Sequence, residues 1–474
     1  MLHIFKRKDK SMAIINVIVA FGNWFWGIPI LFLIVGGGLY MGLRLGFIQF
    51  RKFGYICTQT FGKMFAKSGD GEISQFSAAC AALASSVGAS NIVGVPAAIA
   101  LGGPGAVFWI WLIALIGCGT KYVEVALAIK TREKSEDGGW VGGAPYYLRT
   151  VPKIGKFLAG FFAIGLMVEL VPSLISQGLS ATAQLEVFGI SETASGIVLA
   201  ILVAIIFAGG VFRVMKVTDI MVPVMAVLYI IGALIIVVKN ASAIPEAIAS
   251  IFIYAFTPHA AVGGFAGSTL MLALRWGAAR GVYSNEAGFG TAPTAHATAT
   301  VDHPIRQAFW GVYEVVVDTL IICSMTAIVI LTTGIWTTEE YTTGALAQAA
   351  FHQSFGVAGD YFVAICVFLF VLSTIIAAGM FGWKQAEYLF GLKFSKIWRY
   401  IYPLGIAVAS TGLDLTTMYM VTDGFLAAIM IPNVIGLIIL VPQVKKLQDE
   451  FFNTPGKYYL ADMAEKAERK KAKA

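Results

Sequence analysis

Apolar residues come in long runs along this chain. Runs of about 20 residues, the length that an α-helix needs to cross roughly 30 Å of hydrocarbon, recur over most of the sequence with no large polar block between them. The pattern predicts an all-α polytopic membrane protein with about eleven transmembrane helices and no catalytic domain outside the membrane. The predicted ranges are 13–43, 75–100, 105–130, 156–188, 194–212, 219–239, 265–292, 307–333, 360–391, 398–412 and 416–441.

Composition agrees with this prediction. The 474 residues are 58% hydrophobic and only 13% charged, whereas a soluble protein of this size needs roughly 25% charged residues to cover its surface. The net charge of +7 comes from short loops and from a basic tail after Lys445, so membrane orientation explains it better than a nucleic-acid partner. The expected partners are a lipid bilayer and a small molecule, with no nucleic acid, and a monomer is compatible with the sequence.

Cysteines, histidines and nucleotide-binding motifs give no sign of an enzyme. The five cysteines occur singly and without CxxC spacing, and His259, His296, His303 and His352 lack a metal-binding spacing such as HExxH. The phosphate-cradling GxxxxGK[ST] loop of a primary pump is absent from the sequence, as is a nucleophile with a partner base. No enzymatic activity and no organic cofactor are expected.

Basic loop residues predict the orientation in the membrane. In an eleven-helix arrangement most of them fall on one side, together with the C-terminal tail, and an excess of Lys and Arg marks the cytoplasmic side. They are Arg44, Arg51, Lys52, Lys63, Lys67, Lys130, Arg132, Lys134, Arg149, Lys153, Lys156, Arg213, Lys216, Lys393, Lys396 and Arg399. The protein is therefore expected in the cell membrane with a cytoplasmic C-terminus.

Two of the predicted helices are interrupted by polar, glycine-rich segments. These are SSVGASNIVGVP at 85–96 and RGVYSNEAGFGTAP at 280–293, each containing an asparagine and ending in proline. Each interruption opens a block of about five helices, a pattern typical of inverted-repeat transporters whose first helix in each half is unwound near the bilayer midplane. The resulting divisions are an N-terminal helix and loop at 1–74, repeats at 75–240 and 265–441, and a basic tail at 442–474.

The unwound backbone suggests a binding site. Backbone groups freed by unwinding are costly in hydrocarbon unless they find a partner. Amides at the N-terminus of a half-helix favour a carboxylate, and carbonyls at a half-helix C-terminus coordinate Na⁺. The alternative is that Gly88, Ser90 and Gly94 only let helices pack closely, but two interruptions in corresponding positions favour a site.

At these segments the sequence resembles the alanine or glycine:cation symporter family, which are sodium:amino-acid symporters with the leucine-transporter fold. GASNIVGV is similar to the family's GTGNIAGV, RGVYSNEAGFGTAP to its RGVFSNEAGLGSAP, and TVDHPIRQ to its TDHPVRQG, while LGGPGAVFWIWLIALIGCGTKYVEVALAIKTR is close throughout. The similarity runs from about Gly71 to Pro442. It implies a divergent member with a five-plus-five inverted repeat, one extra N-terminal helix, and sodium-coupled import of a zwitterionic amino acid.

The resemblance also implies two sets of site residues. Na⁺, the coupling ion, is assigned to the carbonyls of Ala84 and Val87 and the hydroxyls of Ser373 and Thr374. The same hydroxyls have an alternative role, which is to bond back to the preceding turn of their own helix. The implied substrate-binding residues are Ala89, Ser90, Asn91, Gln177, Tyr283, Asn285, Gly288, Thr374 and Ala378.

Several positions in the implied pocket depart from the family pattern. Ala378 stands where the family has a tryptophan, and Ala89 and Ser90 replace the threonine and second glycine of GTGN. Loss of an indole from a pocket wall opens space, so a substrate bulkier than alanine or glycine is expected. A proton-coupled transporter of an amino-acid-like solute and a transporter-like sensor are the alternatives.

Ionisable residues in predicted spans are further functional candidates, because such residues are rare inside membranes. They are Glu124, Glu169, Asp219, Glu286, Glu314 and Asp318. Glu286 is expected to accept free amides of the interrupted helix. Lys121 and Glu124, three residues apart, are expected to form a structural pair.

The N-terminus provides a direct test of the helix count. With an odd number of spans, Lys6, Arg7, Lys8 and Lys10 lie outside the cell, against the rule that placed the other loops. Either the later loops dominate the orientation, or the first stretch lies partly in the interface as an amphipathic helix. Cysteines introduced at residues 2–10 should react with an impermeant maleimide from outside the cell; labelling only from the cytoplasm contradicts eleven spans.

Overall fold

The computed structural model describes residues 16–22, 24–64, 73–257, 270–337, 345–410 and 415–471. Within these ranges the chain is almost entirely helical, and the strands found there form one short hairpin of β1 (Glu133–Lys134) and β2 (Trp140–Val141). The basic N-terminal cluster, His259 and the predicted helix start at 265–269 lie outside the described residues.

Six of the described helical segments are long and apolar enough to cross a membrane, and a bent pair makes a seventh. The pair is α6 (Gln75–Ser86) with α7 (Val95–Gly102). The six are α8 (Ala106–Thr131), α10 (Gly155–Leu185) with its 3₁₀ extension, α12 (Gly210–Lys239), α16 (Pro304–Val315) continued through a π-helical segment into α17 (Ser324–Thr333), α19 (Val357–Trp398) and α21 (Leu415–Asn453). The prediction of an all-α polytopic membrane protein is therefore confirmed.

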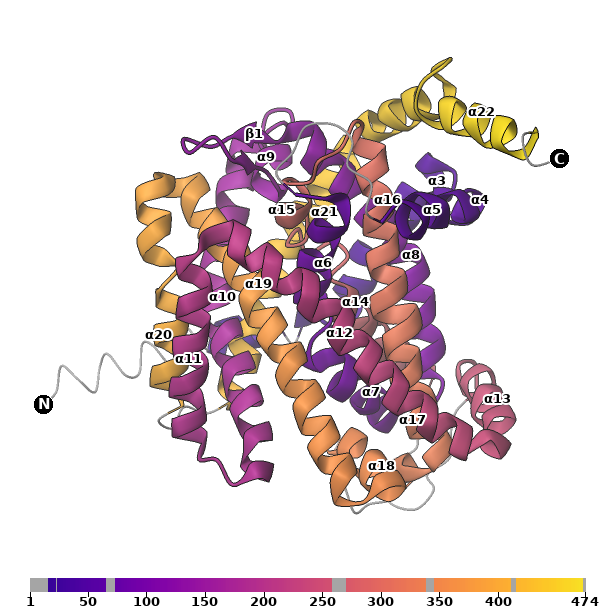
Figure 1. Cartoon of the computed structure of the whole chain (residues 1–474), viewed down its shortest axis with the longest axis vertical. Helices are drawn as coiled ribbons and strands as arrows, with labels where there is room; N and C mark the ends of the chain where they lie inside the picture. Colours follow the sequence, from indigo (N-terminus) through magenta and orange to yellow (C-terminus); the bar gives the residue numbers. More distant parts are fainter. Residues whose placement is uncertain are drawn as a thin grey trace, which may run out of the picture.

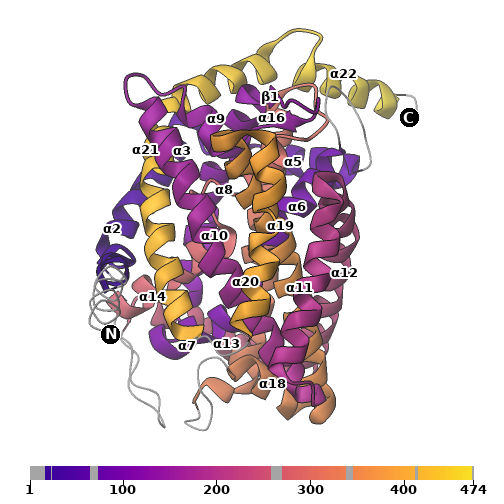
Figure 2. The ribbon, with the colours of Figure 1, turned by 90° about the vertical axis from the view of Figure 1, so that its left-hand side faces the viewer.

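Shorter helices surround these spans. They are α2 (Ile28–Ile30), α3 (Gly37–Leu45), α4 (Ile48–Arg51), α5 (Phe53–Thr60), α9 (Ala144–Leu148), α11 (Glu192–Ala208), α13 (Ile244–Tyr254), α14 (Leu270–Asn285), α15 (Pro293–His296), α18 (Leu346–Phe355), α20 (Ile401–Ala409) and α22 (Tyr458–Lys471). Figure 1 and Figure 2 show β1, α9 and α22 at one end of the bundle and α13 and α18 at the other. The broken helix lies inside, where α6 packs against α12 and α19 while α7 packs against α14.

The first interruption is a break in the helix, as the sequence predicts. Ser74 begins α6 by accepting a hydrogen bond from the Ser77 amide at 3.0 Å. Val87 then leaves helical geometry (φ −77°, ψ 85°), and the chain re-enters a helix through a π-helical segment, Ser90–Gly94. Pro96 lies in the first turn of α7 and has no N–H to donate to the preceding turn. The two halves are bent by 50°.

The second interruption is a longer non-helical connection between α14 and α15. Glu286, Gly288 and Gly290 all have positive φ angles, of 52°, 95° and 76°. The Gly290 amide donates to Glu124 Oε1 at 3.1 Å, and Asn433 Nδ2 donates to the Gly288 carbonyl at 2.8 Å. Side chains from α8 and α21 thus replace the helical hydrogen bonds that this segment lacks.

The boundary between α11 and α12 differs from the prediction. Arg213 and Lys216 were expected in a loop, but α12 begins at Gly210, directly after the turn at Gly209. Arg213 Nη1 donates to the Ile205 carbonyl at 2.9 Å and so satisfies a free acceptor at the end of α11. A charged first turn of a helix looks like a loop in the sequence, which explains the error.

The end of the last predicted helix and the partner of Lys121 also differ from the prediction. Residues after 441 are largely helical, because α21 continues to Asn453 and α22 follows. Lys121 Nζ contacts Glu314 Oε1 at 2.8 Å, with both side chains fully buried, so the partner of Lys121 is Glu314. His296 Nε2 lies 3.2 Å from Glu314 Oε2. This cluster joins α8, α15 and α16.

Removing one member of the buried pair should destabilise the bundle. Glu314→Gln removes the carboxylate that contacts the buried Lys121 ammonium group, with an expected cost of about 3–5 kcal/mol. The thermal unfolding midpoint in detergent should fall accordingly. Asp449→Asn, which breaks the exposed Lys445–Asp449 pair, is the control and should cost less than about 1 kcal/mol. Equal shifts in the two variants would contradict a structural role for the buried pair.

Candidate functional site

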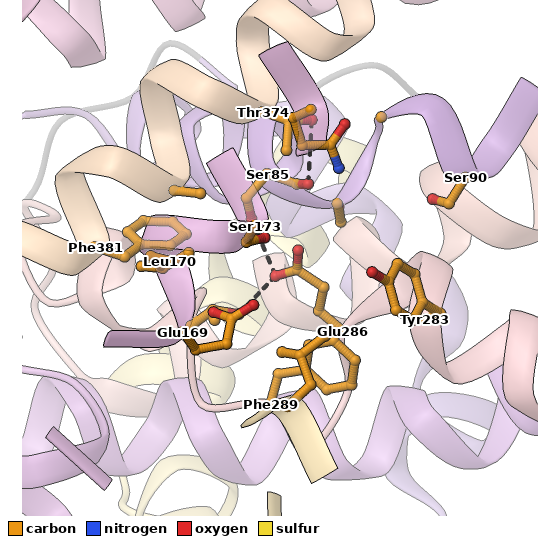
Figure 3. Close-up of a pocket in the computed structure, with 16 residues that line it drawn as sticks. Ser85, Ser90, Glu169, Leu170, Ser173, Tyr283, Glu286, Phe289, Thr374 and Phe381 are labelled. Carbon is orange, nitrogen blue, oxygen red and sulfur yellow. Dashed lines mark hydrogen bonds between the residues drawn. The ribbon is translucent and has the colours of Figure 1, made fainter. Parts of the chain in front are cut away.

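A small cavity of about 50 Å³ lies beside the break in α6–α7 (Figure 3). Its walls come from both interrupted segments and from α10, α19 and α21. The lining residues are Ser85, Ser86, Gly88, Ser90, Glu169, Leu170, Ser173, Gln177, Tyr283, Glu286, Phe289, Thr291, Thr374, Ala378, Phe381 and Leu426. A volume of this size has room for only a few water molecules.

Five of the expected substrate-binding residues line this cavity. They are Ser90, Gln177, Tyr283, Thr374 and Ala378. They come from four separate elements. Only the family resemblance predicted that these elements meet at one site. The other four, Ala89, Asn91, Asn285 and Gly288, are not among the lining residues.

Asn91 is fully buried and holds the break in shape. Its Oδ1 accepts a hydrogen bond from the Gly88 amide at 2.9 Å, and its Nδ2 donates to Asp318 Oδ1 at 2.7 Å. Asp318 also accepts from the hydroxyls of Ser284 and Thr319, at 2.6 and 2.7 Å. Asn91 therefore connects the first interruption to the π-helical segment Val316–Cys323.

Asn285 and Gly288 have supporting positions in the second interruption. Asn285 Oδ1 accepts from the Ala287 amide at 3.0 Å, and the Gly288 carbonyl accepts from Asn433, as described above. Both contacts fix the path of the backbone that carries Tyr283 and Glu286 towards the cavity.

Ser373 and Thr374 of α19 face the last turn of α6. Ser373 Oγ lies 3.2 Å from the Ala84 carbonyl, and Thr374 Oγ1 lies 3.4 Å from the Ser85 carbonyl. Each hydroxyl has a shorter contact, 2.7 and 3.0 Å, with the Phe370 carbonyl in its own helix. Gly88 allows this approach, because an added Cβ would lie 2.7 Å from Thr374 Oγ1.

The geometry of these oxygens suits a small cation. A hydroxyl has one proton, and each of these two hydroxyls can donate it either to Phe370 in its own helix or across to α6. Together with the carbonyls of Ala84 and Ser85 they bring hard oxygens close to one another, the type of ligand that an alkali ion prefers. Sequence reasoning assigned Val87 to this set; the carbonyl that approaches Thr374 is that of Ser85, two residues earlier.

Glu286 joins the two interrupted segments through its carboxylate. Its Oε2 accepts from Ser85 Oγ at 3.1 Å and from Thr291 Oγ1 at 2.5 Å (Figure 3). The expectation that Glu286 accepts backbone amides is not met by these contacts, because the donors are hydroxyls. Glu124 accepts the Gly290 amide instead.

A polar stripe on α10 faces the cavity from the other side. Glu169, Ser173 and Gln177 are spaced four residues apart and so lie on one face of the helix. Glu169 is only 1% exposed, and neither of its carboxylate oxygens has a hydrogen-bond partner among the described residues. Sequence reasoning missed Ser173, although this spacing within an otherwise apolar helix was a signal for it.

Comparisons with known proteins show which family the chain resembles. A family model described as the sodium:alanine symporter family matches residues 11–462. The chain is 45% identical over 445 residues to the uncharacterised transporter YflA of Bacillus subtilis, covering 93% of this chain and 94% of that protein.

Two further relatives carry substrate names. The sodium/alanine symporter AgcS of Methanococcus maripaludis is 36% identical over 436 residues, covering 90% of this chain and 95% of AgcS. The probable sodium/glutamine symporter GlnT of Bacillus subtilis is 33% identical over 421 residues, with coverage of 88% and 86%. The relatives are transporters rather than enzymes. The matches confirm the resemblance found in the sequence: the chain belongs to the sodium:alanine symporter family.

Proposed function

We propose that this protein is a sodium-coupled secondary symporter that imports a zwitterionic amino acid by alternating access. The observation that carries the proposal is the break between α6 and α7, which borders a small cavity and faces the hydroxyls of Ser373 and Thr374. Membership of the sodium:alanine symporter family supports sodium and an amino acid as the transported pair.

The sodium site and the substrate site share the broken helix. Na⁺ would bind between the Ala84 and Ser85 carbonyls and the two α19 hydroxyls, at the C-terminal end of α6. The substrate carboxylate would bind the free amides near Ala89 and Ser90, at the start of the next helical segment. Only three residues, 87–89, separate the end of α6 from the start of the next helical segment. Ion binding that orders the break would therefore also raise the affinity for the substrate, and the coupling would be reciprocal.

The proposed architecture is the leucine-transporter fold. The first repeat would span 75–240 and the second 265–441, each opened by one of the interruptions, with the N-terminal helix as an addition. The end of the bundle with β1, α9 and α22 (Figure 2) carries many of the basic loop residues, which supports a cytoplasmic C-terminus in the cell membrane. Rocking of one group of helices against the rest would open the cavity to each side in turn.

A substrate bulkier than alanine or glycine is part of the proposal. Ala378 lines the cavity on α19 with Phe381 one turn further along, and a tryptophan at 378 would occupy that wall. Family members named for alanine and for glutamine exist among the relatives, so substrate size varies within the family. A proton is the alternative coupling ion, because the carboxylates of Glu169 and Glu286 line the same cavity.

Removing the α19 hydroxyls should weaken the response to sodium. In proteoliposomes, an inward Na⁺ gradient should drive concentrative amino-acid uptake. Ser373→Ala and Thr374→Val should each raise the Na⁺ concentration for half-maximal uptake by roughly tenfold, because each loses one oxygen ligand. Thr332→Val is the matched control, since the Thr332 hydroxyl bonds only to its own helix in the contacts described, at 2.7 Å to Ile328 O and 3.4 Å to Val329 O. Uptake that follows a pH gradient and ignores Na⁺ would favour the proton.

Restoring the indole should narrow the substrate range. In Ala378→Trp, the affinity for alanine and glycine relative to larger amino acids is expected to rise by about tenfold. The reason is that a pocket discriminates by the space that a side chain needs. The measurement is inhibition of labelled uptake by a panel of unlabelled amino acids in wild type and variant. Strong preference of the wild type for glycine or alanine would contradict the larger pocket.

A further inference from the structure

We infer that the α10 stripe of Glu169, Ser173 and Gln177 is a subsite for the substrate's side chain, and that this side chain ends in a hydrogen-bond donor, an amide or an ammonium group. The inference rests on the proposed function for the existence of an amino-acid substrate. It adds the chemical class of the side chain, which family membership leaves open because relatives are named for both alanine and glutamine.

Unpaired acceptors define the subsite. Both carboxylate oxygens of Glu169 and the amide oxygen of Gln177 are buried without a hydrogen-bond partner among the described residues. Buried polar groups in membrane proteins normally find a partner, because an unsatisfied one is costly in an apolar medium. All three atoms can accept a hydrogen bond, and all belong to residues that line the cavity. The cavity therefore has places for donors on its occupant.

Three nearby donors and cations among the described residues are already used elsewhere. Ser85 and Thr291 donate to Glu286. Lys121 is committed to Glu314 at 2.8 Å. The Ser173 hydroxyl, one turn along α10, can supply at most one of the donors that the Glu169 carboxylate can accept. The remaining acceptor positions are open to donors from water or from the bound molecule.

The order of groups across the cavity fits an amino acid with an extended side chain. Figure 3 shows Ser90 on one side of the cavity, Glu169 and Phe381 on the opposite side, and Glu286 between them. With the substrate carboxylate at the amides near Ser90, the α-ammonium group meets Glu286. The side chain then crosses the apolar wall of Leu170 and Phe381 and ends at Glu169.

Such a site selects by the terminal group rather than by length. A side chain with a donor pairs with Glu169, whereas an aliphatic one leaves the carboxylate unpaired and an acidic one is repelled by it. Sites built to hydrogen-bond a substrate group reject analogues that lack it more strongly than apolar pockets reject a change in size. A discrimination of about 10- to 100-fold is expected from one buried charge-assisted hydrogen bond.

Four amino acids of similar length test the inference on the wild-type protein. Glutamine and ornithine end in donors, glutamate ends in a carboxylate and methionine ends in an apolar methyl group. Ligand-induced thermal stabilisation of the purified protein in the presence of Na⁺ measures binding, and proteoliposome uptake measures transport. Glutamine or ornithine should bind about 10- to 100-fold more tightly than glutamate and methionine. Equal affinity for methionine or glutamate would overturn the subsite.

Glu169→Gln identifies the residue and separates the two donors. The variant should weaken ornithine by about 10- to 100-fold and glutamine by less, while methionine binding stays unchanged. Glu186→Gln, the same change at an exposed position just beyond α10, is the control and should alter none of these. Unchanged selectivity in Glu169→Gln would overturn the subsite. Selective binding without sodium-driven uptake would contradict the proposed function and leave the subsite standing. Sodium-driven uptake without side-chain selectivity would support the proposed function and contradict the subsite.

Discussion

Val87 and Gly88 interrupt a helix inside an apolar bundle, and the backbone groups that this releases need partners from within the protein. Asn91 supplies one by accepting the Gly88 amide, and it is itself fixed by the Asp318 carboxylate. On the other side of the break, α19 brings two hydroxyls against the carbonyls of Ala84 and Ser85. The break is therefore held at a fixed geometry, while the backbone and side-chain groups that face the cavity stay available to a ligand. This constraint explains why the same few residues border both the proposed ion site and the proposed substrate site.

Two sets of buried charges in the bundle differ in their partners. Lys121 on α8 and Glu314 on α16 form an ion pair at 2.8 Å, and neither residue lines the cavity. Glu286 and Glu169 line the cavity, the first with hydroxyl donors and the second with no partner among the described residues. A paired charge stabilises a scaffold, whereas an unpaired one at a cavity wall stabilises only a complex. The difference in partners thus separates supporting residues from residues available to a ligand.

Much of the architecture could be predicted from the chain alone, because membrane spans need long apolar runs and unwound segments need glycine and polar residues. Both interruptions were predicted within a few residues of where the helices break. The pairing of Lys121 with Glu314 could not be predicted, since it joins residues far apart in sequence, and local spacing pointed to Glu124 instead. Surface helices such as α13 and α18 were missed because they are too short to give a spanning signal. The sequence also could not show that the Asn91 side chain supports the break; its role in substrate binding stays a prediction.

Two side chains on facing helices, Ala378 on α19 and Glu169 on α10, together define what the cavity can hold. Since α10 and α19 pack against each other, a tryptophan at 378 would fill the space between the broken helix and the α10 stripe and would keep a substrate away from Glu169. Alanine removes that barrier, and a carboxylate without a partner lies behind it. Space alone would favour any larger side chain, including aliphatic ones. Space that ends in an acceptor favours a side chain with a donor at its tip. In the proposed transporter, the alanine at 378 and the position of Glu169 on the cavity wall would therefore act together on selectivity.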